Sequence, residues 1–284
     1  MSINFVIDTG TDLPEEIIVQ YSIKVLPLKV IVDNVEFEDK FGIKSEELYR
    51  RMRQGAMTKT AQVSLQQCLD FFTACAVKGE DSLIYLAFSS ELSGTYQAGR
   101  LAAAQVQELY PSFDITVIDL KAVTFGAGLI VQKTCEFAAQ GASKEEIITF
   151  INNKIKSIQH IFTVENLDYL ARGGRVSNPA AFFGNLLSIK PILYVDEAGR
   201  LIPLEKVRGQ HKLYERITDI VGELAVDLDK QLIYIGHCDN EAGATMLKQL
   251  LAEKFQAKNI VLGTIGSAVG AHSGPGTLAI FFFR

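Results

Sequence analysis

The sequence predicts an α/β protein of two domains, the first built on a mostly parallel sheet flanked by helices and the second an α+β domain with a mixed sheet. A length of 284 residues is typical of about two domains. In the first half, short apolar runs alternate with longer amphipathic segments, which is the pattern of a parallel α/β layer. In the second half, a hairpin signal precedes further strands and helices, which favours a mixed sheet.

Four strands and four helices are expected in the first half. The strands are runs rich in β-branched residues, at 3–8, 24–33, 82–88 and 115–120. The helices are the amphipathic stretches 44–54, 64–78, 92–110 and 124–140. Ser64, with Gln67 three positions later, is expected to form a capping box at the start of the second helix.

A helix over residues 143–158 joins the two halves, and Ser143 with Glu146 predicts a capping box at its start. We place the domain boundary at its end, which gives an N-terminal domain of residues 1–158 and a C-terminal domain of residues 159–284. The second domain is expected to contain a hairpin, three further strands and two helices. The hairpin is 191–196 with 201–207, the strands are 231–237, 259–265 and 278–284, and the helices are 209–229 and 240–256.

Composition and charge argue against several classes of function and location. The net charge of −5 and the lack of a Lys/Arg block argue against nonspecific binding to nucleic acid. The longest nearly apolar run, residues 122–131, is too short for a transmembrane segment, and the N-terminus lacks the pattern of a signal peptide. Four cysteines without a C-x-x-C pair favour buried, reduced thiols and a cytoplasmic location: Cys68, Cys75, Cys135 and Cys238.

The most informative stretch is SSELSGTY at 89–96, which follows a buried strand and precedes a helix. Hydroxyl groups and free N–H groups at a helix N-terminus favour an anion, although Ser89, Ser90 or Ser93 could equally cap the helix. A serine hydrolase is a weaker alternative, because a nucleophile elbow needs G-x-S-x-G and the sequence around Ser93 is ELSGT. His272 would be the base of such an enzyme.

Three further segments carry candidate binding groups. His272 lies in the glycine-rich stretch 266–276, read here as a constrained loop, where it could donate to a carboxylate or bond its own backbone. The arginines of LARGGR at 170–175 could hold an oxyanion or a partner, or simply solvate the end of a short helical segment. Thr60 lies just before the helix that Ser64 caps and is free to meet a ligand.

Metal and nucleotide signals are weak. Asp8 and Asp12 could bind a metal, but Asp12 with Pro14 also suits an ordinary helix start. His237 and Cys238 alone do not have zinc spacing. There is neither a P-loop nor a dinucleotide fingerprint. We therefore expect no metal and no cofactor.

Taken together, these segments resemble the DegV family over nearly the whole chain. The matching motifs are DTGTDLP from residue 8, SSELSGTY at 89–96, LARGGR at 170–175, KPIL at 190–193, VRG at 207–209 and GAHSGPG at 270–276. The resemblance implies a two-domain α/β protein that binds one long-chain fatty acid in a buried tunnel between the domains. It further implies a subunit without catalytic machinery of its own, which presents the carboxylate to the catalytic subunit of a fatty acid kinase.

That kinase makes an acyl phosphate for phospholipid metabolism, and the family role is compatible with transient contact at a membrane surface. The alternatives are a stand-alone acyl hydrolase and a lipid-binding regulatory protein without a kinase partner. By resemblance, the carboxylate-binding residues are Thr60, Ser93, Gly94, Arg175 and His272. Arg208 matches a family arginine at the head-group mouth or the partner surface. Phe182 and Phe183 are examples of side chains available for the tunnel wall.

Overall fold

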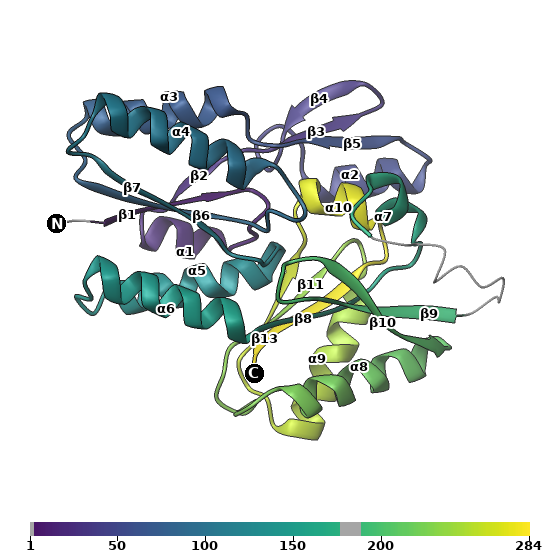
Figure 1. Ribbon diagram of the computed structural model, residues 1–284. Coiled ribbons are helices and arrows are strands. Elements are labelled where there is room, and N and C mark those ends of the chain that lie inside the picture. Colours follow the sequence, from purple (N-terminus) through teal and green to yellow (C-terminus); the bar gives the residue numbers. More distant parts are fainter. Residues whose placement is uncertain (1–2, 177–188) are drawn as a thin grey trace.

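The computed structural model describes residues 3–176 and 189–284, so Phe182 and Phe183 lie outside the described residues. Its first sheet has the strand order β2-β1-β6-β7 and is parallel throughout. The strands are β1 (Ile3–Asp8), β2 (Lys24–Leu26), β6 (Ser82–Ala87) and β7 (Asp114–Asp119). Figure 1 shows α3 and α4 over one face of this sheet and α1, α5 and α6 over the other. These helices are α1 (Glu15–Gln20), α3 (Leu65–Val77), α4 (Thr95–Leu109), α5 (Thr124–Ala138) and α6 (Lys144–Ser157).

The second sheet has six strands in the order β10-β9-β8-β13-β11-β12. Only β11 and β12 pair in parallel, so the sheet is mixed, as predicted. Its strands are β8 (Ile158–Thr163), β9 (Ile189–Val195), β10 (Leu201–Arg208), β11 (Ile233–His237), β12 (Ile260–Thr264) and β13 (Leu278–Phe283). Helices α8 (Gln210–Leu224) and α9 (Glu241–Phe255) pack on one face of it.

Helix α5 is the spacer between the two sheets. It contacts β8, β11 and β13 of the second sheet, while its partner α6 packs beside it under the first. Its sequence, TFGAGLIVQKTCEFA, is apolar around most of its circumference, and ten of its residues are buried. A helix that is apolar on nearly all sides is stable only when other elements cover it on more than one side.

The expectation of one continuous strand over 24–33 is wrong. The segment contains two strands, β2 and β3 (Lys29–Val32), which belong to different sheets. Pro27 lies between them and has no N–H for a ladder, so the chain turns there. A small antiparallel sheet that the sequence did not predict follows, in the order β4-β3-β5, with β4 (Val35–Glu38) and β5 (Thr58–Ala61). Helix α2 (Ser45–Arg53) connects β4 to β5.

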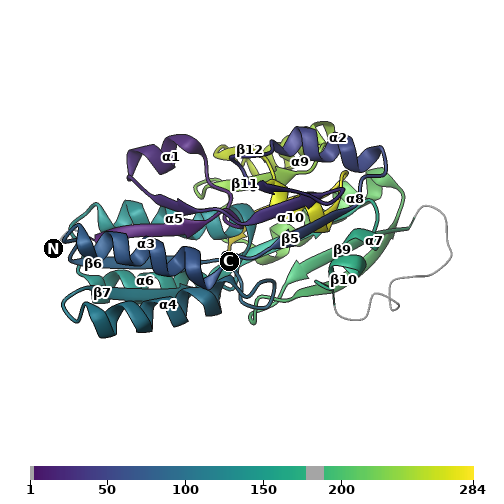
Figure 2. The ribbon, with the colours of Figure 1, turned by 90° about the horizontal axis from the view of Figure 1, so that it is seen from above.

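The expectation of a loop over 266–276 is wrong in its first part, because residues Ser267–Ser273 form helix α10. The carboxylates of Asp12 and Asp39 accept hydrogen bonds from the N–H groups of Gly266 and Ala268, each at 3.1 Å. Those acceptors lie more than 200 residues away in the chain, so local sequence could not indicate them. Helix α10 packs against β5, α2 and α7 (Asp168–Gly173), and Figure 2 shows α10 and β5 side by side near the middle of the molecule.

Several local predictions are confirmed. Both capping boxes form, at Ser64 with Gln67 and at Ser143 with Glu146. Helix α7 is terminated by its C-cap Gly174, whose φ of 68° lies in the left-handed region that glycine adopts readily. The hairpin is β9 with β10, and all four cysteines are free and buried. The division of the chain at residue 158 stays a prediction.

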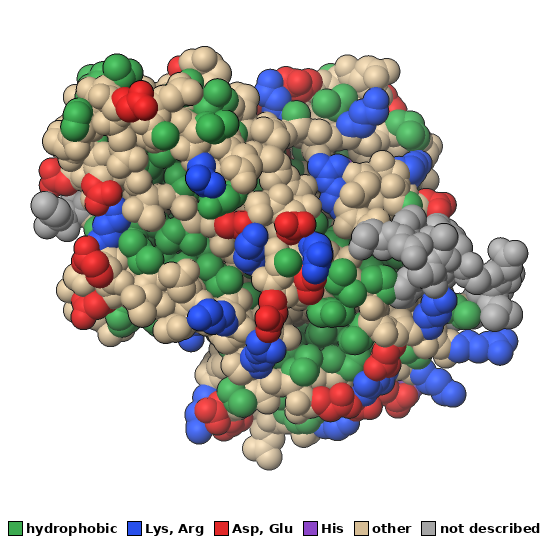
Figure 3. All heavy atoms as spheres, viewed as in Figure 1, with side chains coloured by type: hydrophobic (Ala, Val, Ile, Leu, Met, Phe, Trp, Pro, Cys, Tyr) green, Lys and Arg blue, Asp and Glu red, His purple; other side chains and the backbone are tan. Residues whose placement is uncertain are grey.

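Two boundaries moved by several residues. The helix expected from residue 92 begins at Thr95, because residues 89–94 form turns, and the helix expected to reach residue 229 ends at Leu224. No helix in the described ranges combines the length and hydropathy needed to cross a bilayer. On the face shown in Figure 3, acidic and basic side chains are interspersed with apolar ones.

Candidate functional site

A cavity of about 370 Å³ lies where β8, β13 and α10 meet the turn that leads into α4 and the strand β5. Its wall is mainly apolar. Among the side chains that form it are Phe88, Leu92, Val123, Phe162, Val269 and Phe281. The alternation of strand β13 places Ala279 and Phe281 on the cavity side, whereas Leu278, Ile280 and Phe282 face the core formed with α8 and α9. A largely apolar cavity with a few polar groups is typical of a small-molecule site.

The structure brings five of the six predicted site residues to this one cavity and leaves the sixth outside it. Arg208 ends β10 and is exposed to solvent. The five residues that line the cavity are Thr60, Ser93, Gly94, Arg175 and His272. They come from β5, the start of α4, the turn after α7, and α10, so the polar part of the wall is assembled from four separate segments.

His272 and Thr60 form the central polar pair. The Nε2 atom of His272 lies 2.7 Å from the Thr60 hydroxyl, so they share one hydrogen bond. Burial, reinforced by the positive charge of Arg175, lowers the pKa of His272 to about 4, so the ring is neutral near pH 7. A Cβ atom on Gly173 would lie 2.2 Å from His272 Nδ1, so glycine is required there for the ring to pack against α7.

Ser93 and Gly94 shape the turn that leads into α4. The Ser93 hydroxyl lies 2.9 Å from the Thr95 hydroxyl and accepts a hydrogen bond from the Thr95 N–H. Gly94 is the N-cap residue and has no side chain with which to cap α4, so the Ser93 hydroxyl takes the N–H of the first helical residue instead. A Cβ atom on Gly94 would lie 2.1 Å from Gln62 Oε1, so glycine also makes room for Gln62 at the cavity wall.

The other two serines of this stretch serve the fold. The hydroxyl of Ser89 donates to the carbonyl oxygen of Gly199 at 2.8 Å. The hydroxyl of Ser90 accepts from Lys121 Nζ at 3.1 Å. Neither serine is part of the cavity wall, whereas Ser93 is. Ser90 is therefore a matched control for Ser93.

Arg175 joins two segments of the wall. Its Nε donates to the Leu92 carbonyl oxygen at 3.1 Å, and its Nη1 donates to the carbonyl oxygen of Gly173. Burial lowers the pKa of the guanidinium, but arginine keeps its charge throughout the physiological range. Arg175 therefore places one positive charge beside His272 at the cavity wall.

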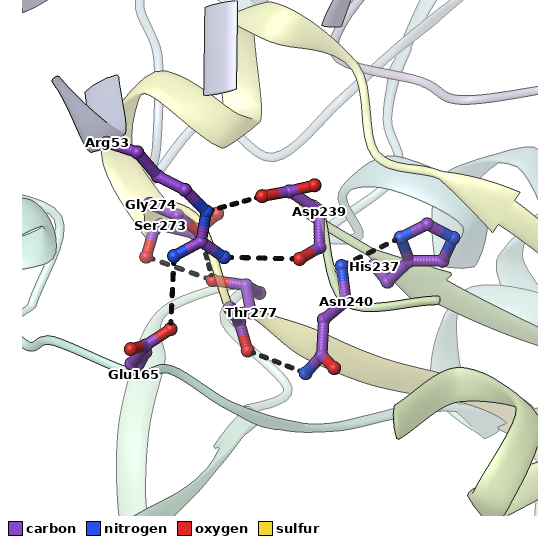
Figure 4. Close-up of polar contacts among 9 residues, drawn as sticks. Arg53, Glu165, His237, Asp239, Asn240, Ser273, Gly274 and Thr277 are labelled. Atoms are coloured by element: carbon purple, nitrogen blue, oxygen red, sulfur yellow. Dashed lines mark hydrogen bonds and ion pairs between the residues drawn. The ribbon is translucent and has the colours of Figure 1, made fainter. Parts of the chain in front are cut away.

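A polar cluster behind α10 holds the loop that follows His272 (Figure 4). Arg53, at the end of α2, forms ion pairs with Asp239 and, at 3.8 Å, with Glu165. The Thr277 hydroxyl donates to the carbonyl oxygens of Ser273 and Gly274, at 2.9 and 2.8 Å. Since Ser273 and Thr277 both line the cavity, this cluster fixes one end of its wall.

The sequence interpretation missed His160, which lies on β8 and also lines the cavity. Its Nε2 accepts a hydrogen bond from the Val123 N–H at 3.3 Å, and burial lowers the pKa of the ring to about 3. Gly126 allows this approach, because a Cβ atom there would lie 2.1 Å from Nε2. The sequence signal was a titratable side chain in a strand that has apolar residues on either side of it, at Ile158, Ile161 and Phe162. Gln62 and Thr124, which also line the cavity, were missed as well.

The hydroxyl of Ser93 and the ring of His272 have separate hydrogen-bond partners. Ser93 and His272 each share a hydrogen bond with a different threonine, Thr95 and Thr60, rather than with each other. The Asp8 carboxylate accepts from Gly10 N–H, Phe88 N–H and the Tyr85 hydroxyl, at 3.0, 3.2 and 3.0 Å. In residues 3–176 and 189–284, no group of three or more His, Cys, Asp or Glu side chains is arranged to hold a metal ion.

Comparison with known proteins identifies the family. The family model described as "Uncharacterised protein, DegV family" matches residues 2–284. This chain belongs to the DegV family. A DegV domain-containing protein of Clostridium perfringens is 37% identical over 277 residues, which cover 97% of this chain and 95% of that protein.

Solved structures of DegV family proteins have the same α/β fold. The fatty-acid-binding DegV family protein of Thermus thermophilus superposes with a TM-score of 0.89 at 28% identity, covering 99% of both chains. The fatty-acid-binding DegV family protein of Streptococcus agalactiae superposes with a TM-score of 0.90 at 27% identity, covering 100% of this chain and 99% of that one. The two-sheet architecture predicted for this DegV protein is thus confirmed.

Proposed function

We propose that this DegV family protein binds one long-chain fatty acid in the cavity, with the acyl chain against the apolar wall and the carboxylate against the polar residues. The observation that carries the proposal is the composition of the cavity wall. Most of the wall is apolar, and it includes the five residues predicted to bind a carboxylate. The fatty-acid-binding relatives with the same fold support it.

The energetics favour a lipid ligand. A palmitate chain has about 14 methylenes, and burial at roughly 0.8 kcal/mol each supplies on the order of 11 kcal/mol before ordering costs. A buried carboxylate needs hydrogen bonds or a cation to offset its desolvation. The Ser93 and Thr60 hydroxyls and the His272 ring are the proposed donors, with the Arg175 charge nearby and Gly94 opening the first turn of α4.

We further propose that the protein has no catalytic role of its own and presents the carboxylate to a separate kinase subunit in the cytoplasm. Family resemblance supports this role. The kinase subunit would then convert the presented fatty acid to an acyl phosphate for phospholipid metabolism. The exposed Arg208 at the end of β10 is the proposed contact for that partner. Arg208→Ala should then leave lipid binding unchanged and slow phosphoryl transfer.

Mass spectrometry of the native protein, followed by lipid extraction, tests the binding proposal. We expect one saturated or monounsaturated acid of about C14–C18 per chain. A protein that carries no lipid and takes up neither palmitate nor oleate would contradict it. Release of free acid from an added acyl ester would instead favour the hydrolase, and lipid binding without phosphoryl transfer in the presence of a cognate kinase and ATP would favour a regulatory protein.

Ligand binding is expected to raise the pKa of His272 from about 4 in the free protein. A nearby carboxylate favours the protonated ring, so binding takes up a proton. The contribution of His272 protonation to fatty-acid affinity is therefore largest below the pKa of the ring in the free protein. It is lost as the pH rises through the pKa of the ring in the complex. NMR titration of the ring with and without fatty acid measures both values, with the exposed His211 as an internal control.

His272→Ala should lower the affinity for fatty acid even if the ring stays neutral, because a neutral imidazole can still donate one hydrogen bond. An unchanged His272 titration curve together with an unimpaired His272→Ala variant would show that this histidine only supports its helix.

A further inference from the structure

His160 is a buried polar side chain in the cavity wall, and it lies outside the proposed carboxylate site. It belongs to β8 and is 2% exposed. Because burial lowers the pKa of its ring to about 3, the ring is neutral near pH 7. Its Nε2 accepts from the Val123 N–H at 3.3 Å. A neutral imidazole that accepts at one nitrogen carries its proton on the other, so the fold places a proton on Nδ1.

The Nδ1–H group of His160 has no hydrogen-bond acceptor within residues 3–176 and 189–284. The ring makes an edge-to-face contact with Phe281, with the ring centroids 5.3 Å apart and the ring planes at 86°. A contact between an N–H group and an aromatic face contributes much less than a hydrogen bond to oxygen. A buried donor without an acceptor is costly and uncommon in native proteins, so a molecule in the cavity is the expected acceptor.

A second polar group lies at the same part of the wall. Thr124 follows Val123 in the chain, lines the cavity and is 4% exposed. Its Oγ1 accepts from the Phe125 N–H, and its own hydroxyl proton has no acceptor in the described part of the chain. The φ of Thr124 is 49°, which β-branched residues rarely adopt. Packing around Thr124, rather than its local preference, therefore sets the position of this hydroxyl.

The pairing of β8 with β13 places His160 and Thr124 away from the proposed carboxylate site. His160 lies opposite Phe281, whereas Thr277, just before β13, bonds through its hydroxyl to Ser273 at the end of α10. A strand advances about 3.3 Å per residue, so roughly 13 Å separate Thr277 from Phe281. An extended chain of C–C bonds of about 1.5 Å, each advancing by less than its length, covers that span in about ten bonds. The two polar groups therefore face the middle of an acyl chain the size of palmitate or stearate.

We propose that the cavity accepts long-chain fatty acids that carry a hydroxyl group near the middle of the acyl chain, with that hydroxyl bonded to His160 Nδ1–H and to the Thr124 hydroxyl. This inference rests on the proposed binding of a fatty acid. A hydroxyl is both an acceptor and a donor, so it accepts from the His160 N–H and shares a second hydrogen bond with Thr124 in either direction. An unsubstituted chain has only methylenes at this place and leaves the His160 donor without an acceptor.

Calorimetric titration of the full chain with stearate and 12-hydroxystearate tests the proposal, and 2-hydroxystearate is the probe that carries its hydroxyl beside the carboxylate. The wild-type protein should bind 12-hydroxystearate no more than about threefold more weakly than stearate, because the hydroxyl is paired. His160→Phe keeps an aromatic ring but removes the donor. It should weaken 12-hydroxystearate relative to stearate by about 5- to 150-fold, the effect of burying a hydroxyl without that partner. The ratio of 2-hydroxystearate to stearate should stay at its wild-type value.

Two variants control for a change in the shape of the cavity. Phe162→Leu alters the same wall two positions along β8 without changing a polar group, so it should affect stearate and 12-hydroxystearate alike. His160→Asn carries an amide on Cγ, the atom to which Nδ1 is attached in histidine, and it retains an N–H donor. His160→Asn should therefore restore most of the affinity for 12-hydroxystearate that His160→Phe loses.

NMR of the wild-type protein gives a readout that needs no variant, and it decides if His160→Phe does not fold. The Nδ1–H resonance of His160 should differ between the stearate and 12-hydroxystearate complexes. Identical resonances in the two complexes, or a ratio of affinities that His160→Phe leaves unchanged, would overturn the proposal. Stearate binding with strong rejection of 12-hydroxystearate by the wild-type protein would overturn this proposal alone, whereas uptake of neither acid would overturn the fatty-acid proposal as well.

Discussion

Replacing Ala279 with phenylalanine is expected to abolish most palmitate binding. Ala279 is 4% exposed, lies on β13 and lines the cavity on the same side as Phe281. A phenyl ring there would occupy the space of several methylenes. Displacing about four of them would remove roughly 3 kcal/mol of burial, which corresponds to about 200-fold in affinity. Titration with palmitate and with acids of decreasing length measures the effect.

The neighbouring position provides the control for this variant. Ile280 faces the core formed with α8 and α9, away from the cavity. Ile280→Val should lower the free energy of unfolding by about 0.5–1.5 kcal/mol and leave palmitate affinity unchanged. Thermal unfolding of Ala279→Phe shows whether the variant remains folded. A folded Ala279→Phe protein with wild-type affinity for palmitate would mean that the acyl chain does not pass this strand.

Ser93→Ala is expected to weaken fatty-acid binding by about 10- to 150-fold, the equivalent of one hydrogen bond to a charged group. The Ser93 hydroxyl lies at the cavity wall and is held by Thr95, so it is oriented before the ligand arrives. The same substitution removes an acceptor for the Thr95 N–H, so part of the effect reaches the fold. Comparing the affinity with the change in melting temperature separates the two contributions.

Ser90→Ala is the matched comparison for Ser93→Ala. Ser90 differs from Ser93 by three positions in the same turn, but its hydroxyl accepts from Lys121 Nζ and does not line the cavity. We expect Ser90→Ala to keep fatty-acid affinity within about threefold of wild type, as for the loss of a partly exposed polar contact. If both serine variants bind as wild type does, Ser93 is not part of the carboxylate site.

Local features of the fold could be predicted from the sequence. The two capping boxes, the glycine that ends α7 and the hairpin β9–β10 all depend on residues a few positions apart, and all are confirmed. The two sheets were readable for a related reason: a buried strand must be apolar along its own length whatever its neighbours are. The polar residues of the cavity were located by motif resemblance, and their roles as ligands stay predictions.

Tertiary structure decided the features that depend on distant partners. The apolar run 24–33 reads as one strand, yet β2 joins the sheet of β1 while β3 pairs with β4 and β5. The sequence of helix α10 is rich in glycine and predicts a loop. In the structure, Asp12 and Asp39 accept hydrogen bonds from the N–H groups at its start. In both places the local sequence is compatible with two conformations, and contacts elsewhere in the chain select one.

The electrostatic state of the site was also fixed by tertiary structure alone. The hydrogen bond between Thr60 and His272 joins residues 212 positions apart, and the neutral state of that histidine comes from burial beside Arg175. His160 also lines the cavity, and it belongs to none of the motifs identified in the sequence. Sequence determines which side chains can titrate or donate, because that is intrinsic chemistry. Whether they do so depends on desolvation and on neighbouring charges, which exist only once the chain has folded.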